Sequence, residues 1–235
     1  SWGLAADEVT SVLQRTDGSM ILGHPGALTF LDPDPRTMAF FRPLPGNGRV
    51  MSMAEDADGA VWLAADKWGL GRLDPDGSLR WFDEDDGLEG QVFAVLVDSR
   101  DKLWLGGTQG LLRREGEGFR EVGLIDPDPN AVPFIRSLRE APDGSLLAST
   151  GMLGVFRVQD GRSDRWSHQG NGLIRSTFDT YALDNGEFWV GTSAGLCRVE
   201  KGRLLRTAAP DPVVDRPVYC ILRDRDGGFW FGTDE

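Results

Sequence analysis

The chain has 235 residues, a formal net charge of −12 and 40% hydrophobic residues. This hydrophobic content supports a folded core, and no apolar run approaches the roughly 18 residues that span a bilayer, so no membrane segment is expected. The acidic excess argues against nucleic acids and anionic membrane surfaces as partners, because both require a basic footprint.

A short pattern recurs along the chain at intervals of 41 to 43 residues. A polar turn, usually Asp-Gly, leads into a β-forming stretch that carries Trp in four of six copies. The equivalent positions are Ile21, Trp62, Trp104, Leu147, Trp189 and Trp230. A period of this length is typical of repeat folds in which each copy is one supersecondary unit.

The third copy shows what one repeat builds. An apolar first strand is expected over 92–99, a second over 102–107, a third over 110–115 and a fourth over 118–122, with tight polar turns between them. Four short antiparallel strands per repeat are typical of a propeller blade. The sequence therefore predicts an all-β propeller of four-stranded antiparallel blades, about 42 residues per repeat, in a single domain over 1–235.

The two ends of the repeat array do not match. The first copy begins at its first strand near Val9, and the sixth ends after its second strand, "FWFGT". Five complete blades plus a partial sixth are predicted. Either the natural chain continues past Glu235 or the piece is a fragment with an open edge, and we favour the first, because an open edge invites pairing with another chain.

Several recurring residues are interpreted as structural. The four Trp residues are expected in the blade cores, and the position ten residues before the Trp is small in every copy except the fifth, which has Asp179. Both cysteines, Cys197 and Cys220, are interpreted as small buried side chains, because they match neither a metal motif nor a disulfide framework. The third-strand arginines are expected to pair with turn aspartates; they are Arg72, Arg113, Arg157 and Arg198.

The segments 184–198, "DNGEFWVGTSAGLCR", and 218–233, "VYCILRDRDGGFWFGT", resemble the two-component regulator propeller repeat. That family is found in extracytoplasmic sensor regions of bacterial hybrid histidine kinases and some diguanylate cyclases. The resemblance implies a periplasmic or extracellular ligand-sensing domain for signal transduction, with no enzyme activity, no cofactor and no metal. Copies one and four depart from the motif, with "GHPGAL" and "STGMLGV" after the second strand, which predicts weaker packing or a free edge there.

Two other functions stay open at this point. One is a propeller that serves as a protein-interaction or dimerisation scaffold, which includes a possible homodimer. The other is a streptogramin-lyase-like enzyme, since that family has similar repeats and is understood to use grouped histidines with a magnesium ion. This chain has only His24 and His168, and their places in the repeats do not require them to converge.

Loops at the start of first strands and between second and third strands share one face of a propeller, which is the usual binding surface. Arginines with nearby aromatic rings on that face predict a small carboxylated or polyhydroxylated ligand, such as an acidic oligosaccharide. The predicted ligand-binding residues are Arg49, Asp66, Lys67, Trp68, Gln91, Phe93, Gln109, Arg136, Arg175, Phe178, Asp179, Arg216 and Tyr219.

Overall fold

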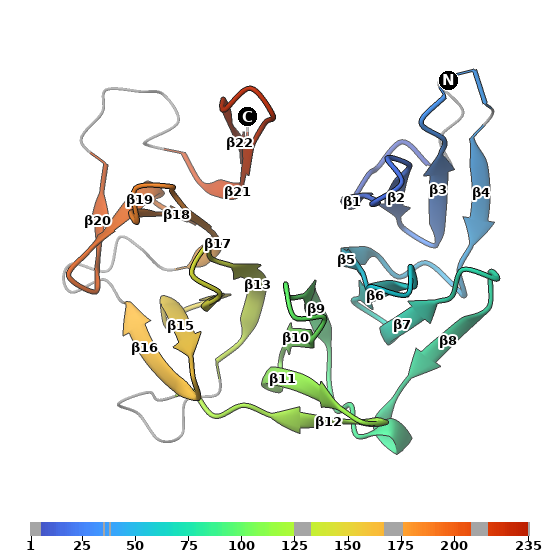
Figure 1. Cartoon of the computed structure of the whole chain (residues 1–235), viewed down its shortest axis with the longest axis horizontal. Helices are drawn as coiled ribbons and strands as arrows, with labels where there is room; N and C mark the ends of the chain where they lie inside the picture. Colours follow the sequence, from blue (N-terminus) through green and yellow to red (C-terminus); the bar gives the residue numbers. More distant parts are fainter. Residues whose placement is uncertain are drawn as a thin grey trace. The chain divides into compact units, whose positions relative to one another are not determined.

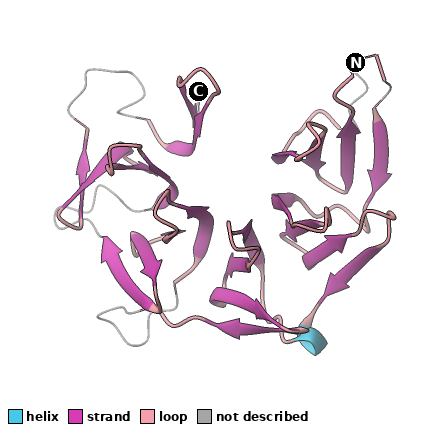
Figure 2. Ribbon diagram, in the orientation of Figure 1, coloured by secondary structure: helices cyan, strands magenta, loops and turns pink. Residues whose placement is uncertain are grey.

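The computed structural model describes residues 6–34, 36–37, 39–124, 133–166, 176–207 and 216–234. Over these ranges the fold is all-β, with 22 strands in five four-stranded antiparallel sheets and one two-stranded sheet (Figure 2). The helical structure in the described ranges is one 3-10 turn, η1 (Glu84–Asp86). The predicted propeller fold is confirmed, with five four-stranded blades and a two-stranded sixth.

Each sheet consists of consecutive strands of the chain, and within a sheet each strand pairs with the strand before and after it (Figure 1). The first two sheets are formed by β1 (Ser11–Gln14), β2 (Met20–His24), β3 (Ala27–Leu31) and β4 (Phe40–Pro43), then β5 (Val50–Glu55), β6 (Val61–Ala65), β7 (Gly69–Leu73) and β8 (Leu79–Phe82). The third is formed by β9 (Val92–Val97), β10 (Leu103–Gly107), β11 (Gly110–Glu115) and β12 (Gly118–Glu121).

The last three sheets contain the remaining ten strands. They are β13 (Ile135–Glu140), β14 (Leu146–Thr150), β15 (Val155–Gln159) and β16 (Arg162–Trp166), then β17 (Thr177–Ala182), β18 (Phe188–Thr192), β19 (Gly195–Glu200) and β20 (Arg203–Arg206), and finally β21 (Val218–Arg223) with β22 (Phe229–Thr233). The chain divides into two compact units, one of residues 1–105 with 113–120 and the other of residues 106–112 with 121–235. The predicted single domain over 1–235 stays a prediction.

Within each unit, neighbouring first strands are joined through the position ten residues before the Trp. In the first unit, the Ser11 and Ser52 hydroxyls donate to main-chain carbonyls of the next first strand, at 2.7 and 3.2 Å. In the second unit, the Ser137 hydroxyl donates to the Asp179 carboxylate at 2.8 Å, and Asp179 accepts the Ile221 N–H at 2.9 Å. A small polar residue at this position therefore lets two first strands approach and bond.

Three of the four blade Trp residues are held by an aspartate six residues earlier in the chain, whereas Trp189 has Leu183 at that position. Asp56 accepts the Trp62 indole N–H at 2.9 Å, Asp98 accepts that of Trp104 at 2.8 Å, and Trp230 is bonded to its own turn aspartate at 2.9 Å. Asp56 and Asp98 also accept main-chain N–H groups of their β-turns. One side chain thus shapes the turn and satisfies the indole donor.

The Gly-Thr pair after the Trp has a separate role for each residue. A Cβ atom on Gly191 would lie 3.0 Å from the Val218 Cγ1 and closer still to the Val218 carbonyl oxygen, so glycine allows β21 to approach β18. The Thr192 hydroxyl donates to the Gly195 carbonyl at 2.7 Å. In copy four, Thr150 makes the same bond at 2.8 Å to Gly154, one residue further along. The hydroxyl thus closes this turn of copy four as well, and the weaker packing predicted for copy four stays a prediction.

Two predicted core positions are wrong, and both lie in the two-stranded sheet. Trp62 is 1% exposed, whereas Trp230 is 65% exposed, and Cys220 is exposed while Cys197 is buried. In earlier copies the following sheet covers the Trp ring, as Arg114 does for Trp62 and Phe229 for Trp189, and a following first strand covers the position of Cys220. Neither cover lies over β21 and β22 in the described part of the chain.

The third-strand arginines divide into two kinds. Arg72 lies 3.8 Å from the Asp56 carboxylate, and Arg157 pairs with the turn residue Asp143, as predicted. Arg113 and Arg198 instead pair with glutamates two residues further along their own strands, so the prediction is wrong for them. Residues i and i+2 of a strand lie on one face, which brings these charges together without a turn.

Candidate ligand-binding surface

A row of three aromatic rings and one arginine crosses three first strands of the second unit. The Arg136 guanidinium lies 5.2 Å from the Phe134 ring centroid and 5.5 Å from that of Phe178, and the Phe178 and Tyr219 rings are 4.8 Å apart. Arg136 is exposed, Phe178 is half-buried and Tyr219 is 48% exposed. We call these four residues the Arg136 ladder. Three of its members were predicted, and Phe134 was missed.

β-Bulges turn these side chains outward. The register shifts between Ile135 and Ser137 in β13, and the same irregularity occurs around Phe178 in β17 and around Tyr219 in β21. A bulge inserts one unpaired residue and changes the direction of its side chain. The bulged residue of each first strand is therefore the ladder residue. Phe134 precedes β13, and its ring stands against Gly151, where a Cβ atom would lie 2.9 Å from the Phe134 Cδ1.

The charge of Arg136 is available to a ligand. Among the described residues, no carboxylate pairs with its guanidinium, which is flanked by aromatic rings. A guanidinium held against rings keeps its N–H edges for in-plane bidentate bonds to a carboxylate, while the rings offer faces to a sugar or another apolar surface. The ladder can therefore recognise a ligand that combines an anionic group with a flat apolar face.

Asp179 is adjacent to Phe178 but does not belong to this surface. It is 4% exposed, and it accepts a charged hydrogen bond from Arg139 at 2.8 Å in addition to its bonds to Ser137 and the Ile221 N–H. Arg139 also donates to the Ile221 carbonyl at 3.0 Å and lies 5.4 Å from a tyrosine ring. The geometry gives Asp179 a role in joining β13, β17 and β21. Sequence reasoning missed Arg139, which is one of three charged residues in β13.

The predicted residues of the first unit gather at the start of β5 and in the β6–β7 turn. Arg49 and Asp66 exchange hydrogen bonds, with the Arg49 N–H donating to the Asp66 carboxylate at 2.8 Å, and the Gln91 side chain donates to the Asp66 carbonyl at 2.9 Å. Lys67 donates a hydrogen bond to the Asn47 side chain at 2.8 Å. Sequence reasoning missed Asn47. Arg49 also lies 3.3 Å from the exposed Glu8 carboxylate, so intramolecular partners take up both cations.

The other predicted residues are placed as follows. Trp68 packs against Trp81, with ring centroids 5.4 Å apart, and covers Gly48, so it belongs largely to the hydrophobic core. Phe93 lies half-buried in β9. Gln109 lies in the turn before β11.

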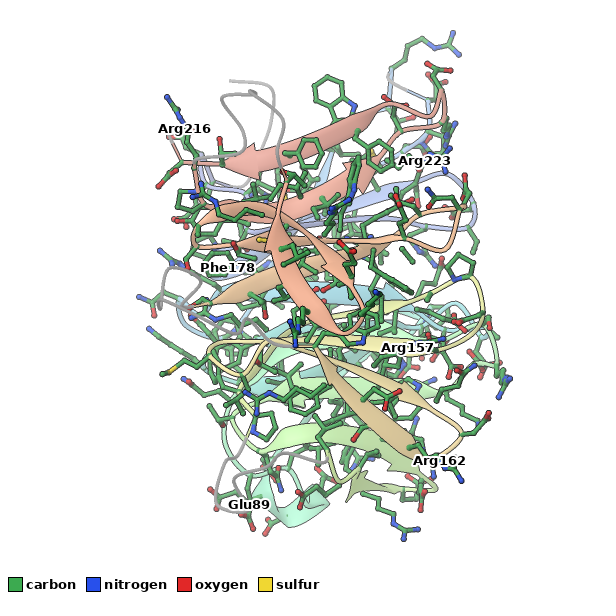
Figure 3. All side chains as sticks on the ribbon, turned by 90° about the vertical axis from the view of Figure 1, so that its left-hand side faces the viewer. Glu89, Arg157, Arg162, Phe178, Arg216 and Arg223 are labelled. Carbon is green, nitrogen blue, oxygen red and sulfur yellow. The ribbon has the colours of Figure 1, made fainter. Side chains whose placement is uncertain are left out.

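Arg216 precedes β21 and lies on the same side of the second unit as Phe178, opposite Arg157 and Arg162 (Figure 3). Its guanidinium lies 3.5 Å from the Asp234 carbonyl. Arg175 lies outside the described residues. Arg49 belongs to the first unit, so the predicted convergence of its charge with the arginines of the second unit stays a prediction.

His24 is the last residue of β2, as the repeat pattern indicates, and it is fully buried. One ring nitrogen lies 2.7 Å from the Glu8 carbonyl oxygen and the other 2.9 Å from the Thr29 hydroxyl. His168 lies outside the described residues. In the described ranges no three His, Cys, Asp or Glu side chains form a metal-binding group, and no helix is long and apolar enough to cross a membrane.

Comparison with known proteins supports the fold and the repeat. Residues 212–235 match the family model "Two component regulator propeller", which confirms the resemblance read from the sequence over that segment. No curated protein sequence matches the chain.

Solved structures of several propellers are similar. One is the extracellular domain assigned to a hybrid two-component system of B. thetaiotaomicron, at 18% identity and TM-score 0.72, covering 98% of this chain and 38% of that one. Another is a catalytically inactive virginiamycin B lyase of Staphylococcus aureus with quinupristin, at 15% identity and TM-score 0.77, covering 97% and 79%. A third is PorZ, a surface component of the type-IX secretion system of Porphyromonas gingivalis, at 16% identity and TM-score 0.73, covering 96% and 37%. The chain thus spans less than two-fifths of the first of these relatives.

Proposed function

We propose that this chain, a β-propeller that carries a two component regulator propeller repeat, is the extracytoplasmic ligand-sensing domain of a bacterial signal-transduction protein. The output domain of such a protein would be a histidine kinase or a diguanylate cyclase. The observation that supports sensing is the Arg136 ladder, in which an exposed guanidinium without a carboxylate partner among the described residues lies between two half-buried aromatic rings. Its chemistry suits an acidic oligosaccharide, whose carboxylate would bind Arg136 while a sugar face lies against the rings.

The proposed role is binding without turnover. Both ring nitrogens of His24 are held by groups of the protein, which leaves this histidine unsuited to act as a general base. The likeness to virginiamycin B lyase is at 15% identity and concerns the fold. The alternative role as an interaction or dimerisation scaffold stays open, and it predicts a flat apolar patch instead of a charged aromatic surface.

The test is a binding comparison between two arginine variants of the second unit. Oligogalacturonides and matching neutral oligosaccharides are screened by thermal shift, and the affinity of a hit is measured by calorimetry. Arg136→Ala is expected to weaken binding at least tenfold, about 1.4 kcal/mol. Arg162→Ala removes an exposed arginine on the opposite side of the unit and is expected to leave the affinity unchanged (Figure 3).

Equal affinity of Arg136→Ala and wild type for a bound acidic oligosaccharide would assign the ligand to another surface. Equal binding of neutral and acidic oligosaccharides would show that the guanidinium does not select the ligand. Failure of every oligosaccharide to bind, together with concentration-dependent dimerisation of the chain, would favour the scaffold.

A further inference from the structure

The first unit contains a pocket of about 380 Å³ that the proposed function does not use. It lies among the β5–β6 turn, the β9–β10 turn and the third-strand residues Arg72 and Arg114, and Trp62 also lines it. The two turns are tied together, because the Ala57 N–H donates to the Asp101 carboxylate at 2.9 Å. A hydrogen bond therefore links the two turns that line the pocket.

Two arginines of the pocket lie over the Trp62 ring. The Arg114 guanidinium lies 4.9 Å and that of Arg72 lies 5.5 Å from the Trp62 ring centroid. The Nε atoms of both arginines are buried and have no hydrogen-bond acceptor among the described residues. A buried donor without an acceptor is costly, and stacking on the ring removes water from these cations. An anion at their remaining N–H groups would offset that cost.

The charged side chains around the pocket differ in whether they have a partner of opposite charge. Arg72 has two carboxylate neighbours, Asp56 and Asp74, at 3.8 and 2.7 Å. In the part of the chain that the structure describes, Arg114 and Lys102 have no carboxylate partner, and the exposed Asp58 carboxylate has no cation or donor. The pocket thus offers two unpaired cations and one unpaired anion in a small volume.

From this arrangement we infer that the pocket binds a small zwitterion, an α-amino acid or a dipeptide. The carboxylate of the ligand binds the Arg114 guanidinium with support from Lys102, and its ammonium binds the carboxylates of Asp58 and Asp101. A volume of about 380 Å³ accommodates a molecule of that size. The inference concerns residues separate from the Arg136 ladder, so the two proposals succeed or fail independently.

The indole N–H of Trp62 reports directly on this pocket, because it donates to Asp56 on the pocket wall. Its ¹H–¹⁵N resonance is followed while glycine, glycylglycine, acetate and methylamine are titrated separately. Glycine or glycylglycine is expected to shift the resonance in a saturable way, with an affinity at least tenfold higher than that of acetate or methylamine. The single-charge probes each lack one of the two proposed contacts.

Variants then assign the contacts. Arg114→Gln and Asp58→Asn are each expected to weaken binding of the zwitterion about tenfold. Arg113→Gln is the matched control, because Arg113 is the adjacent residue, lies 5.6 Å from the Trp104 ring and does not line the pocket. Urea unfolding of each variant verifies that the fold is retained.

Three results would overturn the inference. The first is no saturable shift of the Trp62 indole with either zwitterion. The second is an acetate affinity equal to that of glycine, which would indicate a plain anion site. The third is an Arg114→Gln variant that is folded and binds as well as Arg113→Gln does.

Discussion

In four of the first strands, a single bulged residue decides what the start of the strand presents to solvent. In the second unit the bulged residues are Arg136, Phe178 and Tyr219, and in β5 the equivalent residue is Met51. The backbone is alike in all four strands, so the side chain alone sets the chemistry. Binding properties can therefore change from one repeat to another without any change in the fold.

Gly191, two residues after Trp189, lies where an added side chain would hinder the approach of the neighbouring strand. Gly191→Ala is expected to destabilise the protein by about 1–3 kcal/mol, because the added Cβ meets the main chain of Val218 in β21. The measurement is urea unfolding followed by Trp fluorescence.

Gly118→Ala is the control for this substitution. A Cβ atom on Gly118 has no neighbour within 4 Å, so the change in stability is expected to stay within about 0.5 kcal/mol. Equal unfolding midpoints for the two variants would contradict the close approach of β18 and β21.

At the scale of the strands, polar bonds join the first strands of each unit at one repeating position. Ser11 and Ser52 bond to a main-chain carbonyl of the following strand. In the second unit the fifth copy replaces the small residue with Asp179, and the fourth copy supplies Arg139 to neutralise it. The two exceptional residues thus form one element that spans β13, β17 and β21.

A double-mutant cycle tests this element. Asp179→Ser alone is expected to cost about 2 kcal/mol, less than the 3–5 kcal/mol typical of a fully buried pair, because Arg139 is 34% exposed. In an Arg139→Leu background the same substitution should cost at least about 1 kcal/mol less, since no charge is then left without its partner. Additive losses measured by urea unfolding would show that the two residues stabilise the strands independently.

At the scale of the whole molecule, several surface carboxyl groups have hydrogen bonds that stabilise their ionised form and lower their pKa. Hydrogen bonds from Ser19 lower the pKa of Asp17, those from Ser145 lower the pKa of Asp143, and the Trp230 indole N–H lowers that of Asp224. The Arg113 guanidinium lowers the pKa of Glu115 in the same direction. A carboxyl whose pKa is lower in the folded protein than in the unfolded chain favours folding when it is ionised.

Stability is therefore expected to be fully present above the ordinary carboxyl range, about pH 4, and to fall as the pH drops through the lower pKa values of the folded state. Protonation removes these bonds and leaves the 25 Lys and Arg charges unbalanced. The urea unfolding midpoint should be lower at acid pH than at neutral pH. An unchanged or higher midpoint in acid would show that relief of the net negative charge outweighs the local bonds.

The amino-acid sequence by itself determined the repeat, the four-strand blade and the position of the turns. These depend on local patterns of Gly, Asp and apolar residues that recur along the chain. Pairs within one hairpin, such as Asp56 with Trp62, follow from the same spacing. Only the tertiary structure decided which side chains emerge at the bulges and that Asp179 is buried and bonded to two other first strands. It also brought Arg114 of one blade onto the Trp62 ring of another. The burial of Asp179 and the contact of Arg114 with Trp62 depend on residues about 40 or more positions apart, and a local pattern carries no information about what the next blade will place against it.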